Sequence, residues 1–192
     1  FDLWNGAQSG SSNYGRFRLE LSSSAIDSTL AGAQSFNLTM VSGTSGPVSQ
    51  QINATSLTNI TDGLWHHYAV TLMSGSTDGG LRCNFYRDGT LNRSQVLWQG
   101  AGSQMQEVTG ALRAHIGSLI TTAEGGGAQY AGKLSASLDE FRYWKAERTG
   151  QEIGRYWFDQ VGGGTNTDVA NTNLGVYYKF NEGITQTASY DR

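Results

Sequence analysis

Apolar and polar side chains alternate along several short segments, and this pattern limits the fold more than any other feature of the chain. Residues 17–22 (FRLELS) and 35–43 (SFNLTMVSG) carry an apolar side chain at almost every second position. Successive side chains of a β-strand point to opposite faces, so each segment is expected to be a strand with one buried face. Residues 81–85 repeat the pattern and lead into Asp88-Gly89, a pair typical of a tight hairpin turn.

Further strands are expected along the rest of the chain. The polar segment 48–57 (VSQQINATSL) suits a sheet edge or a solvated face, and 111–120 is another strand candidate. Residues 130–144 (YAGKLSASLDEFRYW) are expected to form the longest strand region, with a bulge or two-sided burial near Asp139, where the alternation breaks. Residues 175–183 (GVYYKFNEG) predict one more strand.

One short α-helix is predicted near residues 149–159. Thr149 can cap its N-terminus, and Glu152 follows at the spacing of a capping box. The chain of 192 residues has 26 glycines and one proline, a composition that suits many short strands joined by turns. We therefore predict an all-β fold, an antiparallel sandwich with jelly-roll or Greek-key connections.

The expected organisation is one β-sandwich over residues 1–160, a polar linker over 161–175 and a terminal strand within 176–192. That strand would close the sheet or lead to a neighbouring domain. The chain begins at Phe1 and shows no signal peptide, so we expect a piece or a processed form of a larger protein.

Charge and composition argue against several classes of partner. The net charge is -3 and basic residues form no run, so nucleic acid is not an expected partner. No apolar stretch is long enough to span a membrane, and we expect no membrane insertion. Cys83 is the only cysteine, which excludes an intrachain disulfide, and its alternating context predicts a small buried side chain.

The segments LWHHYAVTL (64–72), FYRDGTL (85–91) and YAGKLSASLDEFRYWKAERTGQEI (130–153) follow one another in a recognisable order. Their order and spacing resemble the laminin-G-like branch of the concanavalin A-like lectin/glucanase superfamily, with pentraxin-like relatives. Two features depart from the family pattern: Arg87 replaces an apolar residue before Asp-Gly, and the spacing from Gly132 to Asp139 is longer than usual.

The resemblance implies a non-catalytic jelly-roll that binds a glycan or a cell-surface partner, as one module of a secreted adhesin or a phage virion or tail protein. An extracellular or virion-surface location follows as an expectation. The alternative is a structural or oligomerisation module that docks neighbouring domains or subunits and has no soluble ligand. A glycoside hydrolase is disfavoured, because the alternating carboxylates of the superfamily's hydrolases are absent and the adjacent Asp139 and Glu140 would point to opposite faces.

Candidate binding residues remain few. Trp4, Trp98 and Tyr130 stand next to turn glycines and could form an aromatic platform for a sugar, although each could equally pack on the sandwich. The resemblance also implies that Ca²⁺ could bind a rim loop, where residues 121–129 offer Glu124 and Gln129. The alternative is a solvated loop without metal.

The Trp65-His66-His67 stretch suggests an active site but is better explained as structure. On a strand, His66 and His67 point to opposite faces and cannot chelate one metal together. We interpret the stretch as a strand in the middle of the sandwich and a family signature. Trp65, Trp144 and Trp157 are expected in the core, whereas His115 is expected to be a structural histidine.

Overall fold

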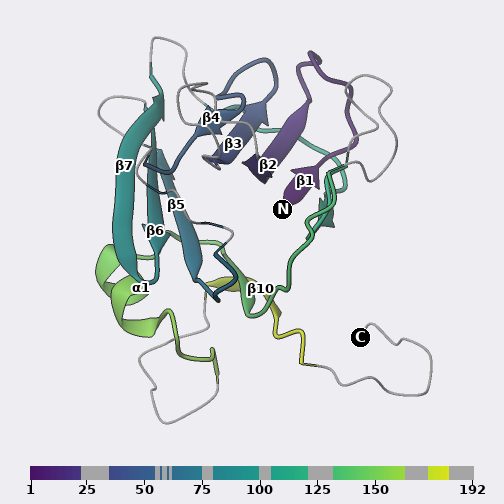
Figure 1. Cartoon of the computed structure of the whole chain (residues 1–192). Helices are drawn as coiled ribbons and strands as arrows, with labels where there is room; N and C mark the ends of the chain where they lie inside the picture. Colours follow the sequence, from purple (N-terminus) through teal and green to yellow (C-terminus); the bar gives the residue numbers. More distant parts are fainter. Residues whose placement is uncertain are drawn as a thin grey trace, which may run out of the picture.

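The computed structural model describes residues 1–22, 35–54, 57, 60, 62–74, 80–99, 105–120, 132–162 and 173–181 (Figure 1). The described strands, in chain order, are β1 (Asp2–Trp4), β2 (Gly15–Ser22), β3 (Ser35–Ser42), β4 (Gln50–Gln51), β5 (Tyr68–Ser74), β6 (Leu81–Arg87), β7 (Thr90–Trp98), β8 (Arg113–His115), β9 (Phe141–Trp144) and β10 (Leu174–Tyr178). One helix, α1 (Gly150–Tyr156), lies between β9 and β10 in the chain.

The strands form antiparallel sheets. One sheet has the order β4-β3-β2-β1-β8, and a second has the order β5-β6-β7. A third, two-stranded sheet pairs β10 with β9. The first two sheets face each other and leave β4 and β7 as edge strands of the described structure (Figure 1). The prediction of an antiparallel β-sandwich with one short helix is confirmed.

The core lies between the two larger sheets. Its fully enclosed side chains come from both of them and from the segment after β4: Leu38, Ile52, Leu57, Cys83 and Phe85. Phe85 has no exposed surface, and its ring lies 5.0 Å from the ring of Phe36 across the sandwich. Burying side chains of this size contributes about 1.5–3 kcal/mol each, so this layer dominates the stability of the fold.

The predicted alternation accounts for most of this core. Phe17 and Leu19 on β2 and Phe36 and Met40 on β3 pack against the enclosed residues, as their period of two requires. Cys83 is buried as expected, and its burial raises the pKa of the thiol to about 12.

The hairpin and the helix also form where the sequence predicts them. Asp88 and Gly89 have φ angles of 50° and 75°, the left-handed conformation that a tight hairpin turn needs. Thr149 caps α1, and the Glu152 side chain accepts a hydrogen bond from the Thr149 backbone N–H at 2.8 Å, which completes the capping box. The turn and the helix meet where Gly89 faces the ring of Trp157.

The long strand predicted over 130–144 is wrong for the described part of that range. Only Phe141–Trp144 form a strand, β9. Glu140 has a φ of 53°, which turns the backbone immediately before β9. Leu134 and Leu138 are 39% and 42% exposed, so no second layer covers the alternating apolar side chains that suggested a strand.

Two other predicted strands are shorter than expected. Among the described residues of 48–57, only β4 is a regular strand, and it stands at a sheet edge, as its polar composition suggested. Ser49 has a φ of 48°, which ends the strand on one side. Within 111–120 only β8 pairs, with β1.

A buried ion pair fastens a long connection to the outer face of the larger sheet. Asp2 and Arg16 have fully buried side chains and form two parallel contacts, of 3.0 and 2.7 Å. Ile120 donates its backbone N–H to Asp2 at 2.7 Å, and its carbonyl accepts from Arg16. Because both charges are satisfied by partners far apart in the sequence, the pair fixes the segment before residue 121 against β1 and β2.

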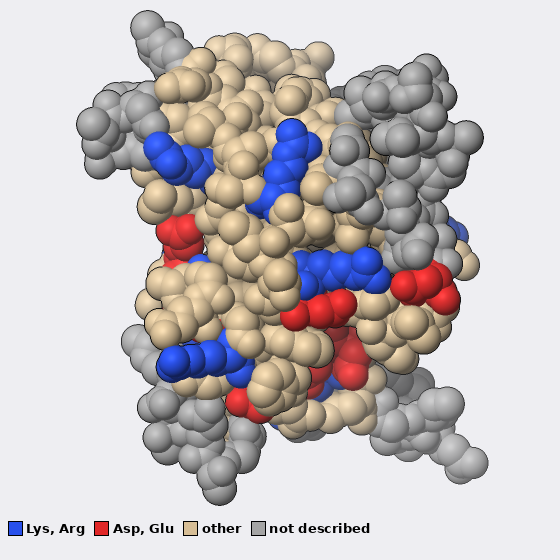
Figure 2. Space-filling view, turned by 60° about the vertical axis from the view of Figure 1, so that its left-hand side comes forward, with Lys and Arg blue, Asp and Glu red and all other residues tan. Residues whose placement is uncertain are grey.

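The charged side chains are unevenly spread over the side of the molecule that carries β7 and α1. In the view of that side, the acidic side chains lie at mid-height and below (Figure 2). The top of this face, toward which β4 lies in Figure 1, shows Lys and Arg side chains as its only described charges.

The contact between the hairpin turn and α1 can be tested with Gly89→Ala. A Cβ at this position would lie 2.4 Å from Trp157 Cδ1, in a backbone conformation that already disfavours alanine. We expect a loss of about 2–4 kcal/mol in the free energy of unfolding, measured by urea denaturation. Gly63→Ala is the matched control, because Gly63 has a similar φ of 79° and open space around its Cβ position. Equal losses in the two variants would contradict the packing role of Gly89.

Candidate ligand-binding groove

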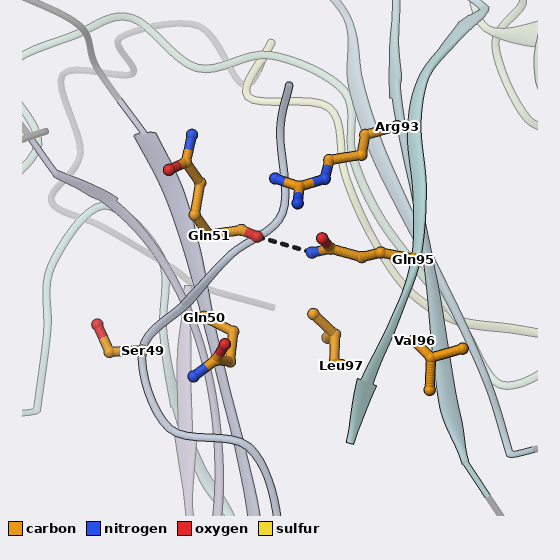
Figure 3. A pocket seen from close by; sticks show the side chains of 7 residues that line it. All are labelled: Ser49, Gln50, Gln51, Arg93, Gln95, Val96 and Leu97. Carbon is orange, nitrogen blue, oxygen red and sulfur yellow. Dashed lines mark hydrogen bonds between the residues drawn. The ribbon is translucent and has the colours of Figure 1, made fainter. Parts of the chain in front are cut away.

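A groove of about 440 Å³ lies between the edge strands β4 and β7, at the side of the sandwich (Figure 3). The described residues that line it are Ser49, Gln50, Gln51, Arg93, Gln95, Val96 and Leu97. Its volume is within the range of small-molecule sites in proteins. We refer to this set of residues as the β4–β7 groove.

The side chains of Arg93 and Gln95 lie on the face of β7 that is turned toward the other sheet, rather than on its solvent-facing side. In the register of β6 and β7, Arg93 stands opposite Phe85 and Gln95 opposite Cys83, both of them core residues. Residues directly opposite one another in an antiparallel pair share a face, so both polar side chains lie on the inner face of the sheet. They can do so because β7 is an edge strand and the groove keeps this side open.

Hydrogen bonds across the groove hold its polar side chains in place. Gln95 Nε2 donates to the backbone oxygen of Gln51 at 2.6 Å, and Arg93 Nη1 donates to that of Asn53 at 3.0 Å (Figure 3). Gln50 Nε2 donates to the backbone oxygen of Val48 at 3.1 Å. Within the described residues, each of these side chains keeps further donors or acceptors for a ligand.

The groove also offers apolar surface. Leu97 packs against the core cluster and is partly buried, and Val96 is 41% exposed. Amide donors and acceptors, a guanidinium and aliphatic contacts are thus combined in one place. Among the described lining residues there is no carboxylate, so the groove is equipped for binding polar ligands rather than for acid–base chemistry.

Of the predicted aromatic residues, Trp4 and Trp98 lie on different sheets. Leu3 stands opposite the core residue Phe17, so the next residue, Trp4, lies on the outer face of its sheet, where Nε1 donates to the Ala7 carbonyl at 2.9 Å. Trp98 stands opposite the buried Leu81, on the inner face of the other sheet. Trp4 and Trp98 therefore do not form one platform.

The remaining predicted site residues cannot be placed. Tyr130, Glu124 and Gln129 lie outside the described residues. Where the chain is described, there is no cluster of three or more His, Cys, Asp or Glu side chains arranged to hold a metal ion. The described helix is too short and polar to cross a membrane.

The prediction that the Trp-His-His stretch is a strand inside the sandwich, with Trp65 in the core, is wrong. Strand β5 begins only at Tyr68, and Trp65 is 69% exposed. Trp144 is partly buried beneath the guanidinium of Arg148, 4.5 Å from its ring centroid. Trp157 is partly buried against the ring of His67 at 5.8 Å.

His66 is the centre of a charged cluster with Asp62, Arg87 and Asp88. Its Nδ1 lies 2.8 Å from Asp88 and its Nε2 2.9 Å from Asp62. Arg87 contributes a further contact to Asp62 at 3.3 Å. Neither acid belongs to the Trp-His-His stretch itself: Asp62 precedes it, and Asp88 lies in the Asp-Gly turn. The cluster ties the segment before β5 to the β6–β7 hairpin.

The two neighbouring histidines have opposite electrostatic environments. Hydrogen bonds to Asp62 and Asp88 raise the pKa of His66 above its ordinary 6.5. The pKa of Asp62 is lowered below 3.8 by the hydrogen bond from the Leu64 backbone N–H and by the one from His66. Burial lowers the pKa of His67, and the nearby Arg142 lowers it further. The charged form is thus stabilised at His66 and destabilised at His67, each relative to a free histidine.

Sequence reasoning did not identify the β4–β7 groove. Gln50 and Gln51 were recognised only as part of a polar edge strand, and Arg93 and Gln95 were not singled out. The available signal was the alternation in this segment: Arg93 and Gln95 occupy the same series of every-second positions as the apolar Leu91 and Leu97. Polar residues at strand positions that are otherwise apolar are candidates for a site at the sandwich edge.

Residues 3–154 match the family model described as the Concanavalin A-like lectin/glucanases superfamily, of the laminin G type. Comparisons with curated proteins and with solved structures give no significant match.

The environments of the two histidines predict a split pH titration. In a ¹H–¹⁵N NMR titration, His66 should titrate above pH 6.5 and His67 below it. Because the pKa of His66 is raised on folding, its ion pairs stabilise the folded protein fully below pH 6.5. This stabilisation is lost as the pH rises through the raised pKa of His66. Asp62→Asn should move the His66 titration downward and leave that of His67 in place. A common midpoint for both histidines would contradict the cluster.

Proposed function

Because the chain belongs to the concanavalin A-like lectin/glucanase superfamily, we propose that it is a non-catalytic module that binds a carbohydrate in the β4–β7 groove. The observation that carries the proposal is the lining of that groove. Gln50, Gln51 and Gln95 present amides, which can donate to and accept from the hydroxyl groups of a sugar, and Leu97 offers apolar contact for its C–H groups.

The same lining supports binding over hydrolysis. Glycoside hydrolysis needs two carboxyl groups, about 5 Å apart for retention or about 6.5–9.5 Å apart for inversion, with one pKa raised. The described lining residues of the groove include no carboxyl group. Outside the groove, Asp62 and Asp88 form one pair of neighbouring carboxylates. The imidazole of His66 fills the space between them, and the pKa of each aspartate is lowered. Neither is suited to act as a general acid.

The proposed setting is the surface of a cell or virion, with the domain as one module of a larger secreted adhesin or virion protein. A groove at the side of the sandwich suits this setting, because a bound chain could lie along the open edge of the domain without entering its core.

A second candidate, a docking module without a soluble ligand, is favoured by one surface. Tyr143 and Val176 stand opposite each other on β9 and β10 and are 40% and 38% exposed. Tyr178 is 50% exposed and stacks on Phe180, with ring centroids 6.0 Å apart. An apolar stripe of this kind is often a contact surface between domains or subunits.

The docking candidate predicts concentration-dependent association through this stripe. Tyr178→Ser should shift the protein toward monomer in sedimentation velocity, because it removes apolar area from the contact. Leu91→Ser is the control, since Leu91 is 51% exposed on β7, on a different sheet. A wild-type protein that stays monomeric at high concentration would remove self-association as the role of the stripe.

The carbohydrate proposal predicts binding on a glycan array that depends on Gln95. Gln95→Ala should weaken the affinity for the array's best ligand about three- to tenfold in calorimetric titration, the effect of losing one or two hydrogen bonds. Ser94→Ala is the matched control, because Ser94 is exposed on the neighbouring position of β7 and does not line the groove.

The array also separates competing sites. Trp4→Ala should leave binding unchanged, because Trp4 lies on the outer face of the other sheet. A loss of binding in Trp4→Ala with none in Gln95→Ala would place the ligand at the outer face. No binding to any glycan on the array would refute the carbohydrate proposal.

A further inference from the structure

We propose that the carbohydrate bound in the β4–β7 groove carries a carboxylate group, such as that of a uronic or sialic acid, and that Arg93 recognises it. This inference rests on the proposed function and names the chemical class of its ligand. It is argued from the position, the partners and the surroundings of Arg93.

Arg93 is a cation in a place that usually holds an apolar side chain. It stands on the inner face of β7, directly opposite Phe85, which has no exposed surface. Partial removal of a guanidinium from water is unfavourable unless an anion or hydrogen-bond acceptors compensate it. The position therefore requires an explanation, because a leucine or valine would suit the core equally well.

The partners of Arg93 do not neutralise its charge. Within the described part of the chain, it forms no ion pair, and its hydrogen bond goes to the neutral carbonyl of Asn53 at 3.0 Å. Other partly buried arginines of this protein differ: Arg87 contacts Asp62 at 3.3 Å, and Arg142 contacts Glu140 at 2.9 Å. Arg93 thus retains charge and free N–H donors facing the groove.

The geometry of the donors favours a carboxylate. A guanidinium has five N–H donors in a planar fork, and the bond to Asn53 uses one of them. Carboxylates match the remaining fork with two parallel hydrogen bonds. Figure 3 shows Arg93 reaching from β7 toward β4 next to the Gln95–Gln51 hydrogen bond, so an acid group at Arg93 would place the sugar ring beside these amides.

The electrostatic surroundings point the same way. The chain has a net charge of -3, yet the described lining of the groove contains one cation and no anion. An acidic ligand would meet little repulsion there.

A structural role for Arg93 makes a different prediction. Inward-pointing charges on edge strands discourage pairing with other chains, and this role would need no ligand. Under that explanation, removal of the charge would promote aggregation and would not alter any preference among sugars.

The test compares acidic oligosaccharides with neutral counterparts of the same skeleton by calorimetric titration. The pairs are oligogalacturonate with its methyl ester, and sialyllactose with the methyl ester of its sialic acid; dextran sulfate provides a sulfated probe. We expect at least one acidic member to bind about tenfold or more tightly than its neutral counterpart. Raising the salt concentration should weaken that binding.

Variants assign the preference to Arg93. Arg93→Gln should abolish the preference for the acidic member, and Arg93→Lys should retain only part of it, because lysine keeps the charge but not the fork. Arg82→Gln is the matched control: it removes the same charge from the adjacent strand and should leave the preference in place. Thermal unfolding of each variant establishes that the fold is retained.

The outcomes are separable. Equal binding of acidic and neutral members, or a preference unaffected by Arg93→Gln, would overturn the carboxylate inference and leave the carbohydrate proposal standing. Binding of dextran sulfate alone would also overturn it, in favour of a sulfated or merely polyanionic ligand. No binding to any probe here, combined with no binding on the glycan array, would refute the carbohydrate proposal itself.

Discussion

The packing of two sheets against each other through one apolar layer determines the rest of this structure. Phe85 on β6 meets Phe36 and Leu38 on β3, and Ile52 continues the layer beyond β4. Because the layer ends where β4 and β7 become edge strands, the space between these strands stays open. An open edge tolerates polar side chains at inward-facing positions, and that is where Arg93 and Gln95 lie.

The Trp-His-His stretch connects two parts of the fold, and its neighbours in the sequence do not reveal this role. His66 joins two aspartates that are 26 residues apart, Asp62 and Asp88, and so connects the approach to β5 with the β6–β7 turn. Asp88 also accepts the backbone N–H of His67 at 2.9 Å. The turn is held on its other side by the contact of Gly89 with Trp157. One hairpin turn is therefore fixed both by charge and by packing.

The proposed binding mode follows from this division of roles. The charged cluster and the helix support the β5–β6–β7 sheet at one end, whereas the groove uses the free edge of the same sheet. Leu97 belongs both to the groove and to the margin of the core, but the polar residues of the groove are separate from the apolar core cluster, so substitutions such as Gln95→Ala should leave that cluster in place. This separation is what makes the proposed function testable by mutation.

Local chemistry determined much of this protein from the sequence by itself. The alternation in 17–22 and 35–43, the Asp88-Gly89 turn, the Thr149 capping box and the burial of Cys83 depend on neighbouring residues, and the structure confirms each of them. Alternation alone misled over 130–144, because a strand also needs a pairing partner and a covering layer, and neither is visible in a local pattern. The exposure of Trp65, the partners of His66 and the groove between β4 and β7 were decided only by the tertiary structure. Each depends on which distant strands lie side by side, and a single sequence does not contain that information in its local periodicity.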